Sequence, residues 1–252
     1  MKTPVIIPAY NEERRIEATL NSLSSSEVEP IVVVNGSTDG TAALAHSFGV
    51  EVIETERQGK MPAIQLCLKE MGARALEPFI LLDADTRPVF PKLWSSVMLR
   101  ALQPEDPRPR AISAPVLFTK NDEDPKSTHV TAAARSVYRQ VHGTLARVMP
   151  GAEPAYYGPN QAYKLATNEA LQAVLALDHI WPEEDVAMTK AVIAHGGSFL
   201  QTIDNRMIVT SPESAAFAPL IDYIRRPNDV HASVADAYRR AAPPDSRPLE
   251  AI

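Results

Sequence analysis

The sequence predicts an α/β fold, in which helices flank a mixed, mainly parallel sheet. Over the first ninety residues, short apolar runs typical of buried strands alternate with segments of helical period. The last of these runs, residues 79–82, stops at Asp83. Strands joined by single helices need right-handed crossovers, which place the strands in parallel. We therefore expect a ligand site at the carboxyl ends of the strands, where such sheets bind their ligands.

Each element of the first half depends on a local pattern. Residues 4–8 form an apolar run typical of a strand, and residues 12–23 carry apolar side chains at helical spacing. Residues 31–34 are β-branched and are followed by the turn-forming pair Asn35 and Gly36. The other expected elements of this half are a helix over 38–48, a strand over 50–53, a helix over 62–75 and a strand over 79–82.

The second half is less regular. Pro91 suits the first turn of a helix over residues 91–102. A long helix is expected over residues 128–148, although Gly143 weakens the prediction for its second part. The remaining predictions are a strand over 111–118, a loop over 120–126, helices over 168–176 and 185–194, a strand over 203–210, and irregular segments over 149–160 and 241–252.

Composition limits the classes of function. The 252 residues are 45% hydrophobic and carry 25 Lys and Arg against 31 Asp and Glu, a net charge of −6. An acidic chain of this kind disfavours a nucleic-acid partner, because phosphates need a basic surface. Cys67 is the only cysteine, and we expect it to be buried. No apolar run is long enough for a membrane span and the first residues lack a signal-peptide pattern, so we expect a cytoplasmic protein; peripheral membrane contact stays open.

The clearest chemical motif is Asp83-Ala84-Asp85, directly after the apolar run 79–82. Residues two apart in extended chain point the same way, so both carboxylates can face one pocket. Such oxygen donors suit Mg²⁺ or Mn²⁺ bridging a diphosphate. A second pair with the same spacing, Asp122 and Asp124, lies among Lys, Asn and Pro with no strand before it. We predict a metal site at the first pair and a solvated loop at the second.

The segments after the first two strands allow two interpretations each. Asn11 can cap the next helix, whereas Tyr10 can lie against a nucleobase at the edge of the sheet. After the second strand, Ser37 or Thr38 can cap the following helix, and the same polar segment can line a base site.

The ordered motifs VIIPAYNEE, VVVNGSTDGT, GKMPAI and FILLDADTRP resemble the GT-A fold, a Rossmann-like fold, of family 2 glycosyltransferases. The resemblance covers about the first ninety residues and resumes at GPNQAYK and WPEED. It implies a nucleotide-sugar site made by Pro8, Ala9, Tyr10, Glu12, Asn35, Gly36, Lys60, Asp83 and Ala84, with Asp85 as principal metal ligand and Asp83 beside it. Asn35 stands where many members carry an aspartate, so the base is left open.

The resemblance also implies that Glu184 and Asp185 are the catalytic pair, with Asp185 as the general base that deprotonates the acceptor hydroxyl. Alternatively, these acids only stabilise the start of a helix. His231 stands where some relatives have a further metal ligand, but a surface role is favoured. Two further sets of residues allow two roles each. Arg225 and Arg226 can contact a diphosphate or acidic acceptor, or simply lie on the surface, and Trp181 can stack on a sugar ring or pack in the core.

We therefore expect one catalytic domain over residues 1–240, with a donor half over 1–90, an acceptor half over 91–240 and a tail over 241–252. The expected reaction transfers a sugar from a nucleoside-diphosphate sugar to a glycan, small-molecule or lipid-linked acceptor, with Mn²⁺ or Mg²⁺ and inversion. The alternatives are a retaining transferase and a non-catalytic nucleotide-sugar binding protein. A nucleotidyltransferase is disfavoured, because it would need a Gly-rich loop after the first strand to hold a triphosphate, and this chain has none there.

Overall fold

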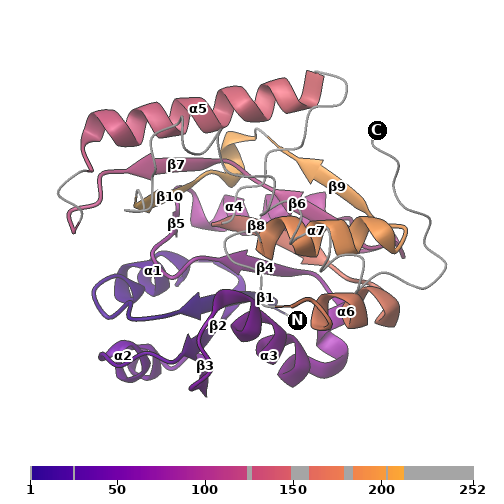
Figure 1. Cartoon of the computed structure of the whole chain (residues 1–252), viewed down its shortest axis with the longest axis horizontal. Helices are drawn as coiled ribbons and strands as arrows, with labels where there is room; N and C mark the ends of the chain where they lie inside the picture. The colour runs from indigo at the N-terminus through magenta and orange to yellow at the C-terminus, as the bar shows by residue number, and fades with distance from the viewer. Residues whose placement is uncertain are drawn as a thin grey trace.

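The computed structural model describes residues 2–24, 26–123, 127–148, 159–178, 184–202 and 204–212. A seven-stranded sheet, in the order β3-β2-β1-β4-β8-β6-β9, forms its centre (Figure 1). Only β8 runs against its neighbours, so the predicted mainly parallel sheet is confirmed. The strands are β1 (Thr3–Ala9), β2 (Val28–Asn35), β3 (Glu51–Thr55), β4 (Phe79–Leu82), β6 (Arg110–Ser113), β8 (Asn160–Lys164) and β9 (Ser198–Gln201).

Helices cover both faces of this sheet because its central strands are apolar on both sides. Val5 and Ile7 of β1 belong to one core and Ile6 to the other. The first core includes side chains of α1 (Ile16–Leu23), α2 (Thr41–Ser47) and α4 (Pro91–Ala101). The second includes side chains of α3 (Lys60–Met71), the 3₁₀ turn η1 (Gly72–Leu76), α6 (Asn168–Leu175) and α7 (Glu184–Ala194). Cys67 is a buried free thiol on α3, as predicted.

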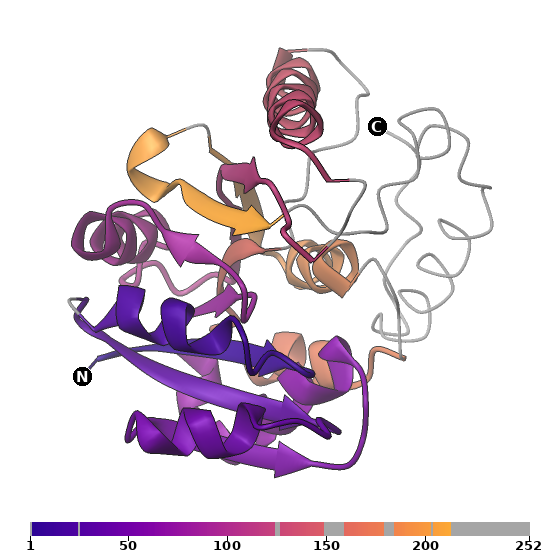
Figure 2. The same ribbon diagram turned by 90° about the vertical axis from the view of Figure 1, so that its left-hand side faces the viewer.

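A second, three-stranded sheet lies beside the first, in the order β5-β10-β7 (Figure 1). Its strands are β5 (Arg87–Pro88), β7 (Val116–Thr119) and β10 (Val209–Pro212). The long helix α5 (His129–Val148) contacts β7 and runs through Gly143 without a break. Figure 2 shows α5 nearly end-on, far from α2 and β3.

Two predicted strands are wrong, and proline and capping chemistry explain the difference. Residues 111–118 form β6 and β7 in different sheets, because Pro115 has no N–H to continue the ladder. The Pro115 carbonyl instead accepts hydrogen bonds from Asn160 Nδ2 at 3.0 Å and from the Val209 amide at 3.2 Å. Within the predicted strand 203–210, Asp204 caps the 3₁₀ turn η2 (Asn205–Met207), and only the end of the segment enters β10.

Two predicted irregular segments lie outside the described residues. They are residues 149–158 of the segment 149–160, and the tail 241–252. Within the described ranges, no helix is long and apolar enough to cross a membrane.

Candidate active site

The site lies where the carboxyl ends of β1, β2 and β4 meet. The strands are neighbours in the sheet, with Ala9 opposite Val34 and Ile6 opposite Leu81. The ends of these strands and the segments that follow them carry most of the residues predicted from the sequence, and α3 and α7 carry Lys60, Glu184 and Asp185. The site is therefore formed by three loops that the parallel sheet brings to one edge.

The loops after β1 and β2 are joined by hydrogen bonds around Asn11. The Asn11 amide donates to Ser37 Oγ at 3.0 Å, and Asn11 Oδ1 accepts from the Thr38 amide at 2.8 Å. Asn11 has φ of 54°, a left-handed conformation that asparagine tolerates. The predicted capping roles of Asn11, Ser37 and Thr38 are therefore wrong. These groups are used between the loops, and α1 and α2 begin later, at Ile16 and Thr41.

The residues predicted to bind the base form one edge of the site. Tyr10 is exposed and its hydroxyl accepts from Gln58 Nε2 at 3.5 Å, whereas Asn35 is buried and its Oδ1 has no hydrogen-bond partner. Pro8 and Ala9 lie in the last part of β1, beside Val33 and Val34 of β2. An unpaired buried acceptor at this position is available to a ligand that donates a hydrogen bond.

Gly36 is needed for this edge of the site. Its φ is 76°, and a Cβ added there would lie 2.7 Å from Gln58 Cγ and 3.1 Å from the Glu56 carbonyl oxygen. Gly36→Ala is expected to reduce the free energy of unfolding by about 2 kcal/mol, through backbone strain and the clash. Gly49→Ala is the control, because Gly49 has φ of 66° with open space around it. Urea unfolding of both variants measures the difference; equal losses would show that the clash contributes nothing.

Lys60 joins the two halves of the chain at this site. From the first residue of α3, its Nζ lies 2.6 Å from Asp83 Oδ1, after β4, and 3.2 Å from Glu184 Oε1, at the start of α7. Burial alone would lower the pKa of Lys60, but the charges of Asp83 and Glu184 outweigh it and hold that pKa above its ordinary value. Glu184 is only 5% exposed, and its Oε2 has no hydrogen-bond partner.

Two further carboxylates, Asp85 and Glu12, lie in the same electrostatic environment. Burial and the charge of Asp83 raise the pKa of Asp85 to about 6. Burial and the charge of Asp85 raise the pKa of Glu12 to about 7, against the opposing charge of Arg15. The Ala84 carbonyl between the two aspartates accepts from Thr19 Oγ1 at 2.7 Å, which holds the loop against α1. The site is therefore crowded with negative charge that a bound cation would stabilise.

Asp185 is the second residue of α7, directly after Glu184, and Tyr163 of β8 lies close to its backbone. Asp185 Oδ1 accepts from the Val186 amide at 2.9 Å, and its carbonyl oxygen lies 3.4 Å from the Tyr163 hydroxyl. The same hydroxyl donates to Gln161 Oε1 at 2.7 Å, while the buried Gln161 Nε2 has no partner. We did not predict these two residues as part of the site. Both lie in the GPNQAYK segment, where the family resemblance resumes, and that segment was the signal that could have identified them.

Comparison with known proteins shows the family of the chain. Residues 5–169 match the family described as Glycosyl transferase family 2. The chain belongs to this family. The resemblance inferred from the motifs is therefore confirmed.

The family assignment is supported by individual relatives. The chain is 36% identical over 95 residues to glycosyltransferase AglE of Haloferax volcanii, a match that covers 33% of this chain and 30% of AglE. It is 46% identical over 52 residues to a 4,4'-diaponeurosporenoate glycosyltransferase of Staphylococcus aureus, covering 20% of this chain and 14% of that protein. The chain thus spans less than a third of each of these two relatives.

The mannosyltransferase PcManGT of Pyrobaculum calidifontis, solved with GDP-Man and Mn²⁺, superposes with a TM-score of 0.62. The two sequences are 18% identical, and the superposition covers 95% of this chain and 72% of PcManGT. The likeness confirms the GT-A fold for this family 2 glycosyltransferase.

The donor set of this family 2 glycosyltransferase fits a hard divalent cation. Asp85, Asp83 and Glu12 offer carboxylate oxygens, which are the ligands that Mg²⁺ and Mn²⁺ prefer. Asp83 is already paired with Lys60, whereas Asp85 Oδ1 accepts only a 3.2 Å hydrogen bond from Thr86. Among the described residues, no three His, Cys, Asp or Glu are grouped closely enough to hold a metal by themselves. A cation here would therefore need further oxygen ligands, from water or a bound molecule.

The second acidic pair behaves differently. Asp122 is 87% exposed and pairs with Lys120 at 2.9 Å, so the predicted solvated loop is confirmed for this residue. Its neighbour Glu123 pairs with Arg15, a connection to the first loop that the sequence did not suggest. The other residues with open roles, Asp124, Trp181, Arg225, Arg226 and His231, lie outside the described residues.

Proposed function

We propose that this family 2 glycosyltransferase moves a sugar from a nucleoside-diphosphate sugar to an acceptor hydroxyl, with inversion and with Asp185 as general base. The observation that carries the proposal is the pair of contacts made by Lys60. They hold Asp83, from the donor half, and Glu184, from the acceptor half, at one ammonium group. Because Asp185 follows Glu184, the proposed base stands beside the proposed diphosphate site.

On the donor side, Asp85 would hold Mn²⁺ or Mg²⁺ with Asp83 beside it, and the cation would stabilise charge on the departing diphosphate. Tyr10, Asn35 and the backbone at Gly36 would contact the base and ribose, at the end of β2. The GDP-Man and Mn²⁺ in PcManGT support a donor and metal of this class.

On the acceptor side, the Asp185 carboxylate would take the proton of the attacking hydroxyl as its oxygen bonds to the anomeric carbon. The bond from that carbon to the diphosphate breaks on the opposite face, and the nucleoside diphosphate leaves. Attack from one face and departure from the other inverts the anomeric configuration. The acceptor class remains a glycan, a small molecule or a lipid-linked sugar.

The donor site is tested by melting the protein with UDP, GDP, ADP and TDP, each with and without Mn²⁺. A nucleotide at a hundred times its dissociation constant adds about 2.7 kcal/mol, which raises the melting temperature by roughly 5–10 °C. We expect this shift for one nucleotide, only with Mn²⁺ present. Asp85→Asn is expected to abolish the metal-dependent part.

Asp122→Asn is the matched control, because Asp122 begins the second pair with the same spacing but lies exposed on a loop. It should leave the nucleotide shift unchanged. No shift with any nucleotide from a folded sample would contradict the donor site, and an equal loss in both variants would contradict the role given to Asp85.

A further inference from the structure

Over the residues of α5 whose side chains the structure describes, the outward face is apolar. Val130, Val137 and Val141 are 77%, 59% and 51% exposed. On a helix of 3.6 residues per turn they fall within roughly 40° of one another. The opposite side of α5 carries Ala132 and Ser136, which are buried. This is the reverse of an ordinary surface helix, whose polar side faces water.

The contacts between α5 and β7 fix which side faces outward. The Phe118 amide of β7 donates to Ser136 Oγ at 2.8 Å, and the guanidinium carbon of Arg135 lies 4.2 Å from the centre of the Phe118 ring. The three valines therefore lie on the side of α5 that is turned away from β7. Both views place α5 along one outer edge of the molecule (Figures 1 and 2).

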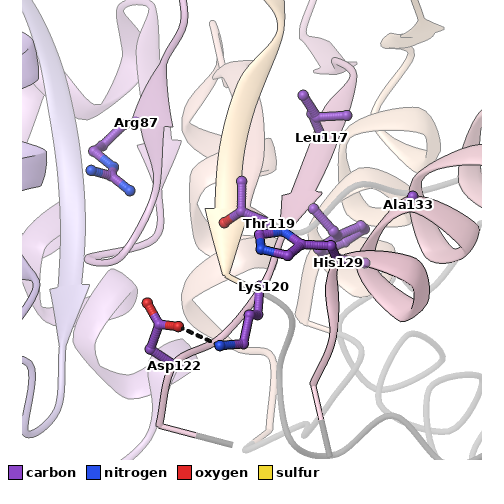
Figure 3. A pocket seen from close by; sticks show the side chains of 9 residues that line it. Arg87, Leu117, Thr119, Lys120, Asp122, His129 and Ala133 are labelled. Atoms are coloured by element: carbon purple, nitrogen blue, oxygen red, sulfur yellow. Dashed lines mark hydrogen bonds and ion pairs between the residues drawn. The ribbon is translucent and has the colours of Figure 1, made fainter.

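A pocket with charged side chains opens beside the first turns of this helix. Its volume is about 520 Å³. Figure 3 shows Lys120 and His129 close together at the pocket, with Arg87 on its other side. Asp122 also lines this pocket and forms an ion pair with Lys120 at 2.9 Å, which leaves Arg87 without a carboxylate beside it among the lining residues. Leu117 and Ala133 give the same pocket an apolar wall.

The charge of α5 also differs from that of the chain. Its 20 residues include three arginines and two histidines but no aspartate or glutamate, in a protein of net charge −6. An apolar outer face, a helix rich in arginine and a pocket at its end that carries Arg87 and Lys120 are features that suit an anionic lipid surface.

We infer that α5 and the adjoining pocket form a docking surface for a bilayer that contains anionic phospholipid. Val130, Val137 and Val141 enter the boundary between headgroups and acyl chains, and Lys120, Arg87 and His129 contact lipid phosphates. A second copy of the chain is a poorer occupant, because it would bring the same basic helix against itself. Docking through α5 does not depend on the transfer reaction, so either can fail without the other.

Sedimentation of the full chain with vesicles tests this inference, using phosphatidylcholine alone and phosphatidylcholine mixed with phosphatidylglycerol. We expect about tenfold or greater preference for the anionic vesicles, and its loss at high salt, where charge attraction is screened. The double variant Val137→Asp, Val141→Asp and the variant Lys120→Glu should each reduce binding about tenfold or more.

Lys69→Glu is the matched control, because it lowers the net charge by two, as each test variant does, from an exposed site on α3. It should leave vesicle binding nearly unchanged, and melting curves confirm that the variants fold. Absence of vesicle binding, or equal effects of the control, would overturn the inference. So would self-association that the valine variant abolishes, or binding of inorganic phosphate in the pocket without any vesicle binding.

Discussion

Asp185→Asn is expected to reduce the rate of sugar transfer by about a hundred- to ten-thousand-fold, the usual contribution of a general base. Asparagine has nearly the same shape but cannot accept a proton from the acceptor hydroxyl. Its Oδ1 can still accept the hydrogen bond from the Val186 amide, 2.9 Å away from Asp185 Oδ1. The start of α7 and the donor site should therefore survive, and the nucleotide-dependent rise in melting temperature should be unchanged.

Initial rates with the donor identified by melting measure this effect. Glu169→Gln provides the comparison, since Glu169 is an exposed acid in the first turn of α6 and tests what loss of such a charge does by itself. Its rate should stay close to that of the wild type. If Asp185→Asn keeps its activity and the product retains the anomeric configuration, the reaction follows the retaining alternative and Asp185 only stabilises its helix.

The fold of the first ninety residues could be predicted from sequence because its determinants are local. Strands β1 to β4 coincide with apolar runs, and each run ends in polar residues at the edge where parallel strands place ligands. The reasoning that distinguished Asp85 from Asp122 was partly wrong, because β7 ends at Thr119, three residues before Asp122. What separates the two residues in the structure is burial, since Asp122 is 87% exposed on a polar loop. The polar residues at the ends of β1, β2 and β4 lie together at one edge of the sheet, as the sequence pattern predicts.

The errors arose where tertiary contacts outweigh local preference. Asn11 has the chemistry of a helix cap, yet its amide oxygen is used by the loop after β2. The apolar run 111–118 looks continuous, but Pro115 divides it between two sheets. The contact of Lys60 with Glu184 joins residues far apart in the chain, and only the fold could show it. Local pattern cannot report such distant partners.

Lys60→Met is expected to reduce the free energy of unfolding by about 3–5 kcal/mol, the usual cost of breaking a buried ion pair from one side. Without the ammonium group, Asp83 and Glu184 would face each other with no cation between them. Glu184 is 5% exposed, so water cannot replace the lost charge. The melting temperature should fall by roughly 6–20 °C in a chain of this size. Denaturant unfolding and calorimetry measure both quantities.

A second change distinguishes lost charge from lost packing. Lys60→Met combined with Glu184→Gln removes the carboxylate that the first change leaves unpaired, so most of the lost stability should return. Lys69→Met, on the exposed side of the same helix, should change stability by less than about 0.5 kcal/mol. If the double variant is as unstable as Lys60→Met alone, the lysine contributes through the packing of its alkyl chain. If stability does return, the double variant can also be tested for donor binding. Weaker binding than in the wild type would then indicate that the changed site contacts the nucleotide, because stability no longer limits that measurement.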